Sequence, residues 1–217
     1  MTGPALRLAR PWLEMRFAAP REVLSWTLNR PGFVTADRLL WREVCNADLT
    51  PELDVADWLA GELAAQDMTD APCFLTSRDI RRMVETRVTV DQVTARCVAT
   101  VGLSNGERIG ARRVYDPASW GTINIAVELD LPLARPALIE ALSLVAEART
   151  AALVELGPDL ETGRITGTGT DCIAVAAPEG EMRFAGLHTA QGEALGRAVH
   201  DAVATGTRDW IGERTSS

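Results

Sequence analysis

The sequence of 217 residues contains no lysine, so all 22 of its basic residues are arginines. This absence excludes a Schiff-base lysine, a lysine nucleophile and the phosphate-binding loop that ends in Lys-Ser or Lys-Thr. Only two histidines are present, His188 and His200. The His-Glu-x-x-His zinc pattern is therefore missing, and one chain cannot supply three histidine ligands.

The four cysteines also lack the short spacings of a metal site; they are Cys45, Cys73, Cys97 and Cys172. No apolar run is long enough to span a membrane. Charged residues near the start interrupt any signal-peptide pattern. We therefore expect no protein-bound metal or other cofactor, no membrane partner, and a cytoplasmic protein with free, mostly buried thiols.

The net charge also argues against a nucleic-acid partner. The net charge is −8, and a nucleic-acid-binding protein would show a basic excess or a basic stripe instead. With 47% hydrophobic and 24% charged residues, the composition is that of an ordinary globular protein. We expect one domain over residues 1–212, followed by a disordered tail over residues 213–217. A homodimer is compatible with this composition.

Apolar and polar residues alternate in several segments, which is the period of half-buried strands. These segments are residues 12–17, 24–28, 93–101 and 123–131. The Pro-Gly pair within residues 29–32 predicts a turn between strands. Short apolar runs predict further strands at residues 73–75 and 172–177.

Apolar residues at helical spacing predict a long helix over residues 135–156, with a proline in its first turn. A last helix is predicted over residues 189–204, in which Gly192 and Gly196 are spaced for close packing, and a shorter one over residues 51–66. Strands and helices do not alternate throughout, which argues against a doubly wound parallel sheet. We expect an α/β fold of the α+β type: a mixed, largely antiparallel sheet with helices packed mainly on one face.

The segment over residues 166–171, Thr-Gly-Thr-Gly-Thr-Asp, is the most unusual in the chain. Its glycines let a ligand approach the backbone closely, and its hydroxyl and N–H groups can hold an oxyanion or an amide. Asp171 can move a proton. The same composition fits a flexible loop with a capping aspartate. The candidate binding residues in this segment are Gly167, Thr168, Gly169 and Thr170.

Polar candidates outside this loop lie near the strand predicted at residues 123–131. Thr122 and Asn124 share one face, where an asparagine can both donate to and accept from a substrate amide. A solvated sheet face is the alternative. Trp120 can stack on a flat ligand or anchor the core, and Ser104 fits either a turn or a ligand contact.

Two more ionisable residues complete the candidate set. His188 lies at the predicted start of the last helix, where the helix dipole favours an anion, and an imidazole titrates near neutral pH. Glu147 lies on the polar side of the long helix. A loop histidine and a surface glutamate are the ordinary alternatives.

Five short motifs occur in order, and a helix with Gly192 and Gly196 follows them. The motifs are TVGLSN at 100–105, GTINI at 121–125, EART at 147–150, TGTGTD at 166–171 and GLHT at 186–189. Together they resemble the adenosylcobinamide amidohydrolase family, CbiZ, over about residues 75–204. The match is weaker over the first seventy residues. One departure is Arg149, where the family commonly has lysine.

The resemblance implies hydrolysis of the amide that joins the aminopropanol arm to the corrin ring of adenosylcobinamide. The product, adenosylcobyric acid, re-enters vitamin B12 synthesis, so the enzyme would serve corrinoid salvage. Cobalt would enter only as part of the substrate. A corrinoid carrier without turnover and a hydrolase of a different amide are the alternatives.

For this activity we expect Asp171 or Glu147 to activate water and His188 to protonate the leaving amine. The N–H groups of residues 167–170 would hold the oxyanion. Thr122 and Asn124 would orient side amides of the corrin. A threonine nucleophile in the Gly/Thr loop is the alternative to direct attack by water.

Overall fold

The computed structural model describes residues 5–45, 48–49, 52–111 and 121–215. Its main sheet has eight strands in the order β4-β3-β2-β12-β8-β6-β5, with β1 paired to β2. The pairs β3–β4 and β8–β12 are parallel, and the other pairs in this sheet are antiparallel. The predicted mixed, largely antiparallel sheet is therefore confirmed. Its strands are β1 (Ala5–Ala9), β2 (Trp12–Ser25), β3 (Gly32–Glu43), β4 (Cys73–Thr76), β5 (Val84–Val90), β6 (Val93–Val101), β8 (Ile123–Leu129) and β12 (Cys172–Ala177).

Two short ladders and four helical segments complete the described part of the chain. The ladders join β7 (Gly106–Glu107) to β11 (Gly167–Thr168) and β9 (Asp159–Leu160) to β10 (Gly163–Arg164). The helical segments are α1 (Val55–Ala65), the 3₁₀ helix η1 (Ile80–Arg82), α2 (Arg135–Leu156) and α3 (Ala190–Thr215).

Helix boundaries agree with the sequence at α2 and differ at the other two long helices. Helix α1 begins later than predicted, because the Asp54 side chain accepts the N–H groups of Ala56 and Asp57. Helix α3 continues to Thr215 instead of ending near residue 204. Residues 213–215, which we expected in a disordered tail, are therefore helical.

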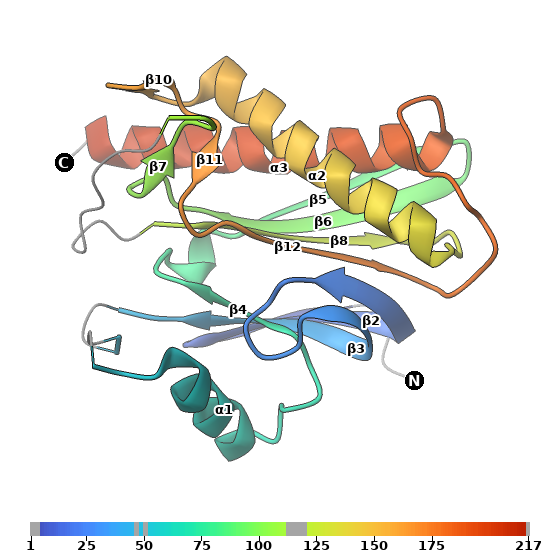
Figure 1. Cartoon of the computed structure of the whole chain (residues 1–217), viewed down its shortest axis with the longest axis horizontal. Coiled ribbons are helices and arrows are strands. Elements are labelled where there is room, and N and C mark those ends of the chain that lie inside the picture. The colour runs from blue at the N-terminus through green and yellow to red at the C-terminus, as the bar shows by residue number, and fades with distance from the viewer. Residues whose placement is uncertain (1–4, 46–47, 50–51, 112–120, 216–217) are drawn as a thin grey trace.

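A bend in β2 lets the sheet fold back on itself. The register between β2 and β3 shifts between Arg16 and Arg21, and Pro20 in this stretch has no N–H to give to a ladder. Strands β2, β3 and β4 therefore lie beneath β12, β8 and β6, as Figure 1 shows. From top to bottom in that view, the layers are α2 with α3, two layers of strands, and α1.

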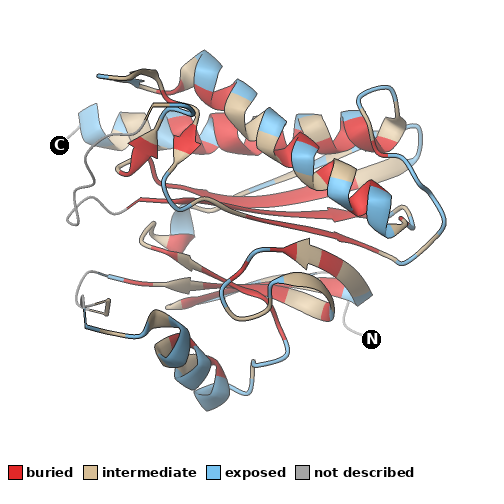
Figure 2. Cartoon of the chain, viewed as in Figure 1, coloured by how far each residue is buried: buried red, intermediate tan, exposed pale blue. Residues whose placement is uncertain are grey.

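The apolar core lies on both faces of the central strands (Figure 2). Ile125 and Val127 of β8 pack toward α2 and α3, whereas Ala126 packs against the folded-back strands. Large side chains such as Trp41 and Phe74 fill the space opposite the small alanines of β8 and β12. All seven residues of β8 are buried, so the face that carries Asn124 is not the solvated sheet face considered above.

Glycine spacing in α3 serves close packing at one of the two predicted positions. A Cβ on Gly192 would lie 2.2 Å from the carbonyl oxygen of Gly186, so only glycine fits there. A Cβ on Gly196 would meet no atom within 4 Å. Gly206, which we did not single out, also packs closely. An ideal Cβ on it would lie 2.6 Å from a side-chain carbon of Val101 in β6.

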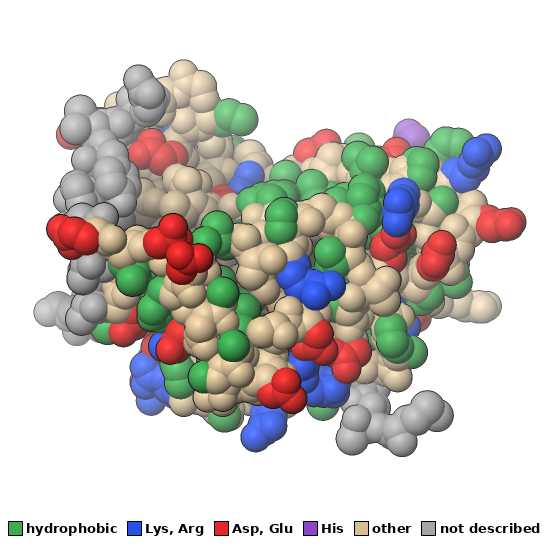
Figure 3. Space-filling view, turned by 60° about the horizontal axis from the view of Figure 1, so that its bottom comes forward, with side chains coloured by type: hydrophobic (Ala, Val, Ile, Leu, Met, Phe, Trp, Pro, Cys, Tyr) green, Lys and Arg blue, Asp and Glu red, His purple; other side chains and the backbone are tan. Residues whose placement is uncertain are grey.

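The surface and the thiols agree with most of the expectations from composition. Acidic and basic side chains are interspersed over the described part of the face drawn in Figure 3. None of the described helices is long and apolar enough to cross a membrane. All four cysteines are free, with Cys73 and Cys97 buried, Cys172 half-buried and Cys45 exposed.

Candidate functional site

A cavity of about 550 Å³ lies at the end of the sheet where β8 and β12 begin; we call it the central cavity. One wall comes from the start of β8 and β12, and the opposite wall comes from β4 and the segment after β2. Five of the predicted site residues line it: Thr122, Asn124, Gly169, Thr170 and Asp171. The fold-back of the sheet thus brings motifs that are distant in sequence to one place.

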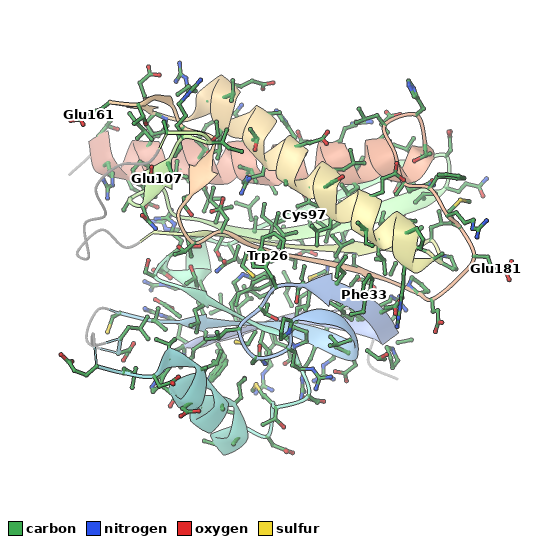
Figure 4. All side chains as sticks on the ribbon, viewed as in Figure 1. Trp26, Phe33, Cys97, Glu107, Glu161 and Glu181 are labelled. Atoms are coloured by element: carbon green, nitrogen blue, oxygen red, sulfur yellow. The ribbon has the colours of Figure 1, made fainter. Side chains whose placement is uncertain are left out.

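Two exposed apolar side chains line one side of the central cavity, its apolar flank. Trp26 is 46% exposed and Leu28 is 51% exposed, although both follow β2 directly. The Trp26 indole N–H donates to the backbone oxygen of Asp171 at 3.0 Å, which fixes the ring between the two strand layers (Figure 4). Trp26 thus offers the stacking surface that we expected from Trp120, which lies outside the described residues.

The Asp171 carboxylate is held by four hydrogen bonds and is only 8% exposed. Its Oδ1 accepts from the Thr168 hydroxyl and from the Ile123 N–H at 3.2 Å. Its Oδ2 accepts from the Arg149 guanidinium and from the Thr168 N–H at 3.0 Å. Burial raises the pKa of Asp171 above its ordinary value, and Arg149 and Thr168 oppose that rise.

Helix α2 holds this loop through two neighbouring residues of the EART motif. Arg149 binds Asp171, and the Thr150 hydroxyl donates to the Thr166 carbonyl at 3.2 Å. Gly167 leaves room for the contact, because a Cβ there would lie 2.8 Å from Asp171 Oδ2. Glu147, predicted as a possible base, is exposed on α2. In this motif, Arg149 is therefore the residue that contacts Asp171.

A second cavity, of about 310 Å³, lies on the other side of the Gly/Thr loop, and we call it the loop cavity. Arg149, Thr150 and Thr168 line it. It shares Gly169 and Asp171 with the central cavity. Asp171 therefore lies in a wall between the central cavity and a cavity lined mostly by polar residues.

The loop N–H groups predicted to hold an oxyanion are mostly engaged within the protein. Thr168 N–H binds Asp171, Gly169 N–H donates to the Asn105 carbonyl at 3.0 Å, and Gly167 pairs with Glu107. Asn105, which ends the TVGLSN motif but was not among the predicted site residues, lines the central cavity. Its side-chain amide lies 3.5 Å from Thr170 Oγ1, so it is an available hydrogen-bond donor.

Thr122 and Asn124 join the parts of the site together. The Thr122 hydroxyl donates to the Thr170 carbonyl at 2.8 Å. The Asn124 amide donates to the Leu75 carbonyl at 2.7 Å, so it links β8 to β4 across the central cavity. The Asn124 carbonyl oxygen lies 3.5 Å from the Thr122 hydroxyl, and a carbonyl oxygen can accept a second hydrogen bond.

Two other candidates lie away from Asp171. His188 is exposed and precedes α3, past the far end of β12, which is roughly 20 Å long. Glu107, beside the loop, and Glu181, in the segment leading to His188, are labelled at opposite ends of the molecule in Figure 4. The structure therefore does not bring His188 and Asp171 together within one chain. The Ser104 hydroxyl accepts from Arg214 at 2.7 Å in a smaller, neighbouring cavity.

Fold and site together describe an α+β protein with a large cavity that has an apolar flank, two asparagine side chains and one buried carboxylate. The model of the adenosylcobinamide amidohydrolase family, CbiZ, matches residues 3–215, and the chain belongs to this family. No curated protein matches the chain. Among solved structures, the PH0078 protein from Pyrococcus horikoshii OT3 is similar at 9% sequence identity and a TM-score of 0.47, over 93% of this chain and 77% of that one.

Proposed function

We propose that this protein hydrolyses the amide between the aminopropanol arm and the corrin ring of adenosylcobinamide, and that the reaction serves corrinoid salvage. The observation that carries the proposal is the position of Asp171 in the wall between the central cavity and the loop cavity. A corrinoid combines a bulky apolar ring with a polar arm. The ring would lie against Trp26 and Leu28, and the arm would extend over Gly169 into the loop cavity.

Asp171 is the proton acceptor in this proposal. Burial raises the pKa of its carboxyl, which makes the ionised form a stronger base than an ordinary aspartate. The Thr168 hydroxyl already donates to Asp171 Oδ1, so nucleophile and base are in contact and Arg149 orients the base. This contact favours the threonine nucleophile, with Thr168 as the particular residue, over direct attack by water.

The steps balance with these residues alone. Thr168 Oγ1 adds to the amide carbon as its proton passes to Asp171, and Asp171 then gives that proton to the leaving nitrogen as the C–N bond breaks. Water hydrolyses the resulting ester by the same proton route. The Asn105 amide would donate to the oxyanion. No separate acid is needed, which agrees with the remote position of His188.

Incubation with adenosylcobinamide tests the proposal, with the products resolved by chromatography and mass spectrometry. We expect adenosylcobyric acid and free aminopropanol in equal amounts. Unchanged substrate that co-elutes with the protein would instead establish a corrinoid carrier, and neither binding nor turnover would leave a hydrolase of a different amide.

Two variants test the nucleophile. Thr168→Ala should lose at least 100-fold in kcat, whereas Thr168→Ser should keep measurable turnover, because it retains the hydroxyl. Quenching the wild-type reaction should trap a corrinoid ester on the peptide that contains Thr168. Full turnover by Thr168→Ala would establish direct attack by water instead.

We also propose that the reaction needs no protein-bound metal. No group of three metal-binding side chains occurs within the described part of the chain. Full activity after exhaustive chelation is expected. Activity that chelation removes and zinc restores would contradict this.

A further inference from the structure

A third cavity, of about 240 Å³, adjoins the central cavity and shares Ser77 and Gly121 with it. Its walls come from the segment after β4, from Ser104 after β6 and from the last turns of α3. We call it the C-terminal cavity. The chemistry proposed above does not use it, yet a molecule in the central cavity would extend directly into it.

Three of the four charged side chains that line the C-terminal cavity are paired with opposite charges. Arg78 makes two hydrogen bonds to Glu213, at 2.6 and 3.0 Å. A hydrogen bond from a neighbouring arginine lowers the pKa of Asp79 to about 2, so this carboxylate is ionised and paired. Arg214 donates to the Ser104 hydroxyl at 2.7 Å. Because Arg78, Asp79 and Glu213 are already paired, a neutral, polar group can bind here without leaving any of them unpaired.

The end of α3 adds a stacked pair of flat groups to this cavity. The Arg214 guanidinium lies 4.1 Å from the centroid of the Trp210 ring, one helical turn earlier, and both residues line the cavity. Purine bases stack on aromatic rings and on guanidinium planes. Ser77 and Asp79 also line the cavity, and side chains of these types bind the hydroxyls of a ribose.

We propose that the C-terminal cavity binds the nucleoside that the substrate carries on its metal, the adenine and ribose of the adenosyl group. This inference rests on the proposed function, in which the corrin ring occupies the central cavity. A ring carrying a nucleoside on one face would place the two parts in adjoining cavities. An acetamide or propionamide arm of the corrin is also neutral and polar, but it has no flat ring to stack on Trp210 and Arg214.

The test compares two corrinoids that differ at this one group, adenosylcobinamide and cyanocobinamide. Dissociation constants are measured by equilibrium dialysis in the dark for the wild type, Arg214→Gln and Trp210→Leu, each also carrying Thr168→Ala so that the ligand is not hydrolysed. Product formation is followed separately with Thr168 intact. Arg197→Gln is the matched control, because Arg197 is an exposed residue of the same helix that pairs only with Glu193 among the described contacts, at 3.5 Å. Arg214→Gln covers the case in which Trp210→Leu fails to fold.

We expect both cavity variants to bind adenosylcobinamide about tenfold more weakly, with cyanocobinamide binding within twofold of the wild type. Equal weakening for both corrinoids would overturn the inference, because the cavity would then hold a part common to both. Unchanged binding of both would overturn it as well. If binding changes as expected but no product forms, the nucleoside site stands and the hydrolase proposal fails. A wild type that binds neither corrinoid would overturn both.

Discussion

Asp171 is the residue on which the proposed chemistry depends, and Arg149 determines how its carboxylate lies. Arg149 is 17% exposed and binds Asp171 Oδ2 from α2. Sequence reasoning singled out Asp171 from its loop composition. It noticed Arg149 only as a departure from the family pattern, because an ion pair between residues 22 positions apart leaves no mark in local sequence.

Replacement of Arg149 tests whether this residue positions the Asp171 carboxylate and lowers its pKa or only supports the fold. Arg149→Met removes the cation that opposes the burial effect, so the pKa of Asp171 should rise further. We expect kcat to fall at least 100-fold and the acid limb of the kcat/KM profile to move to higher pH. Arg149→Lys, which keeps a cation but not the planar guanidinium, should retain more activity than Arg149→Met. An acid limb that stays in place in Arg149→Met would show that Arg149 only supports the fold.

Cys172 also lines the central cavity, but its thiol is a poor nucleophile. Burial raises the pKa of Cys172 to about 12, so about one molecule in ten thousand carries the thiolate at pH 8. We expect iodoacetamide to modify the exposed Cys45 rapidly in the native protein and to leave Cys172 unmodified, as read by mass spectrometry of peptides. Modification of Cys172 at the rate of Cys45 would contradict this account and reopen a cysteine mechanism.

At the scale of elements, the helix and strand predictions succeed where the pattern is local. The long helix α2 has its predicted bounds, and the 93–101 and 123–131 segments pair as antiparallel strands β6 and β8. Strand β5 was missed, and α3 was predicted eleven residues too short. The last turns of α3 depend on contacts with distant residues, such as Glu213 with Arg78, which the local sequence does not encode.

Two glycine-to-alanine substitutions, one in the Gly/Thr loop and one in α3, distinguish crowding of the site from the effect of glycine on backbone entropy. In Gly167→Ala the new Cβ would lie 2.8 Å from Asp171 Oδ2 and 3.3 Å from Arg149, so the ion pair must shift. We expect at least a tenfold fall in kcat with the fold retained by circular dichroism. Gly196→Ala, in the open part of α3, should instead raise the free energy of unfolding by about 0.5–1 kcal/mol and keep activity. Wild-type kcat in Gly167→Ala would show that the geometry of this loop does not control turnover.

At the scale of the whole molecule, the bend in β2 creates the site. It lays β4 opposite the start of β8 and β12, where Asn124 binds the Leu75 carbonyl and the central cavity forms. Residues 24–28 were predicted as one strand, but β2 ends at Ser25, so Trp26 reaches the cavity. The motifs singled out Thr122, Asn124, Gly169, Thr170 and Asp171, all of which line the central cavity. Their partners Arg149, Asn105 and Trp26 follow only from the fold-back.

Asp171 and His188, which the sequence suggested would act together, lie at opposite ends of the sheet, so we expect their replacement to have opposite effects on turnover. Asp171 lies at the start of β12, beside the cavities, whereas His188 lies beyond the far end of that strand. The most direct test is kcat for adenosylcobinamide hydrolysis by Asp171→Asn and His188→Ala, measured side by side with the wild type. We predict that Asp171→Asn loses at least 100-fold and that His188→Ala stays within twofold of the wild type. Wild-type turnover by Asp171→Asn, or a comparable loss in His188→Ala, would contradict the placement of the chemistry at the Gly/Thr loop.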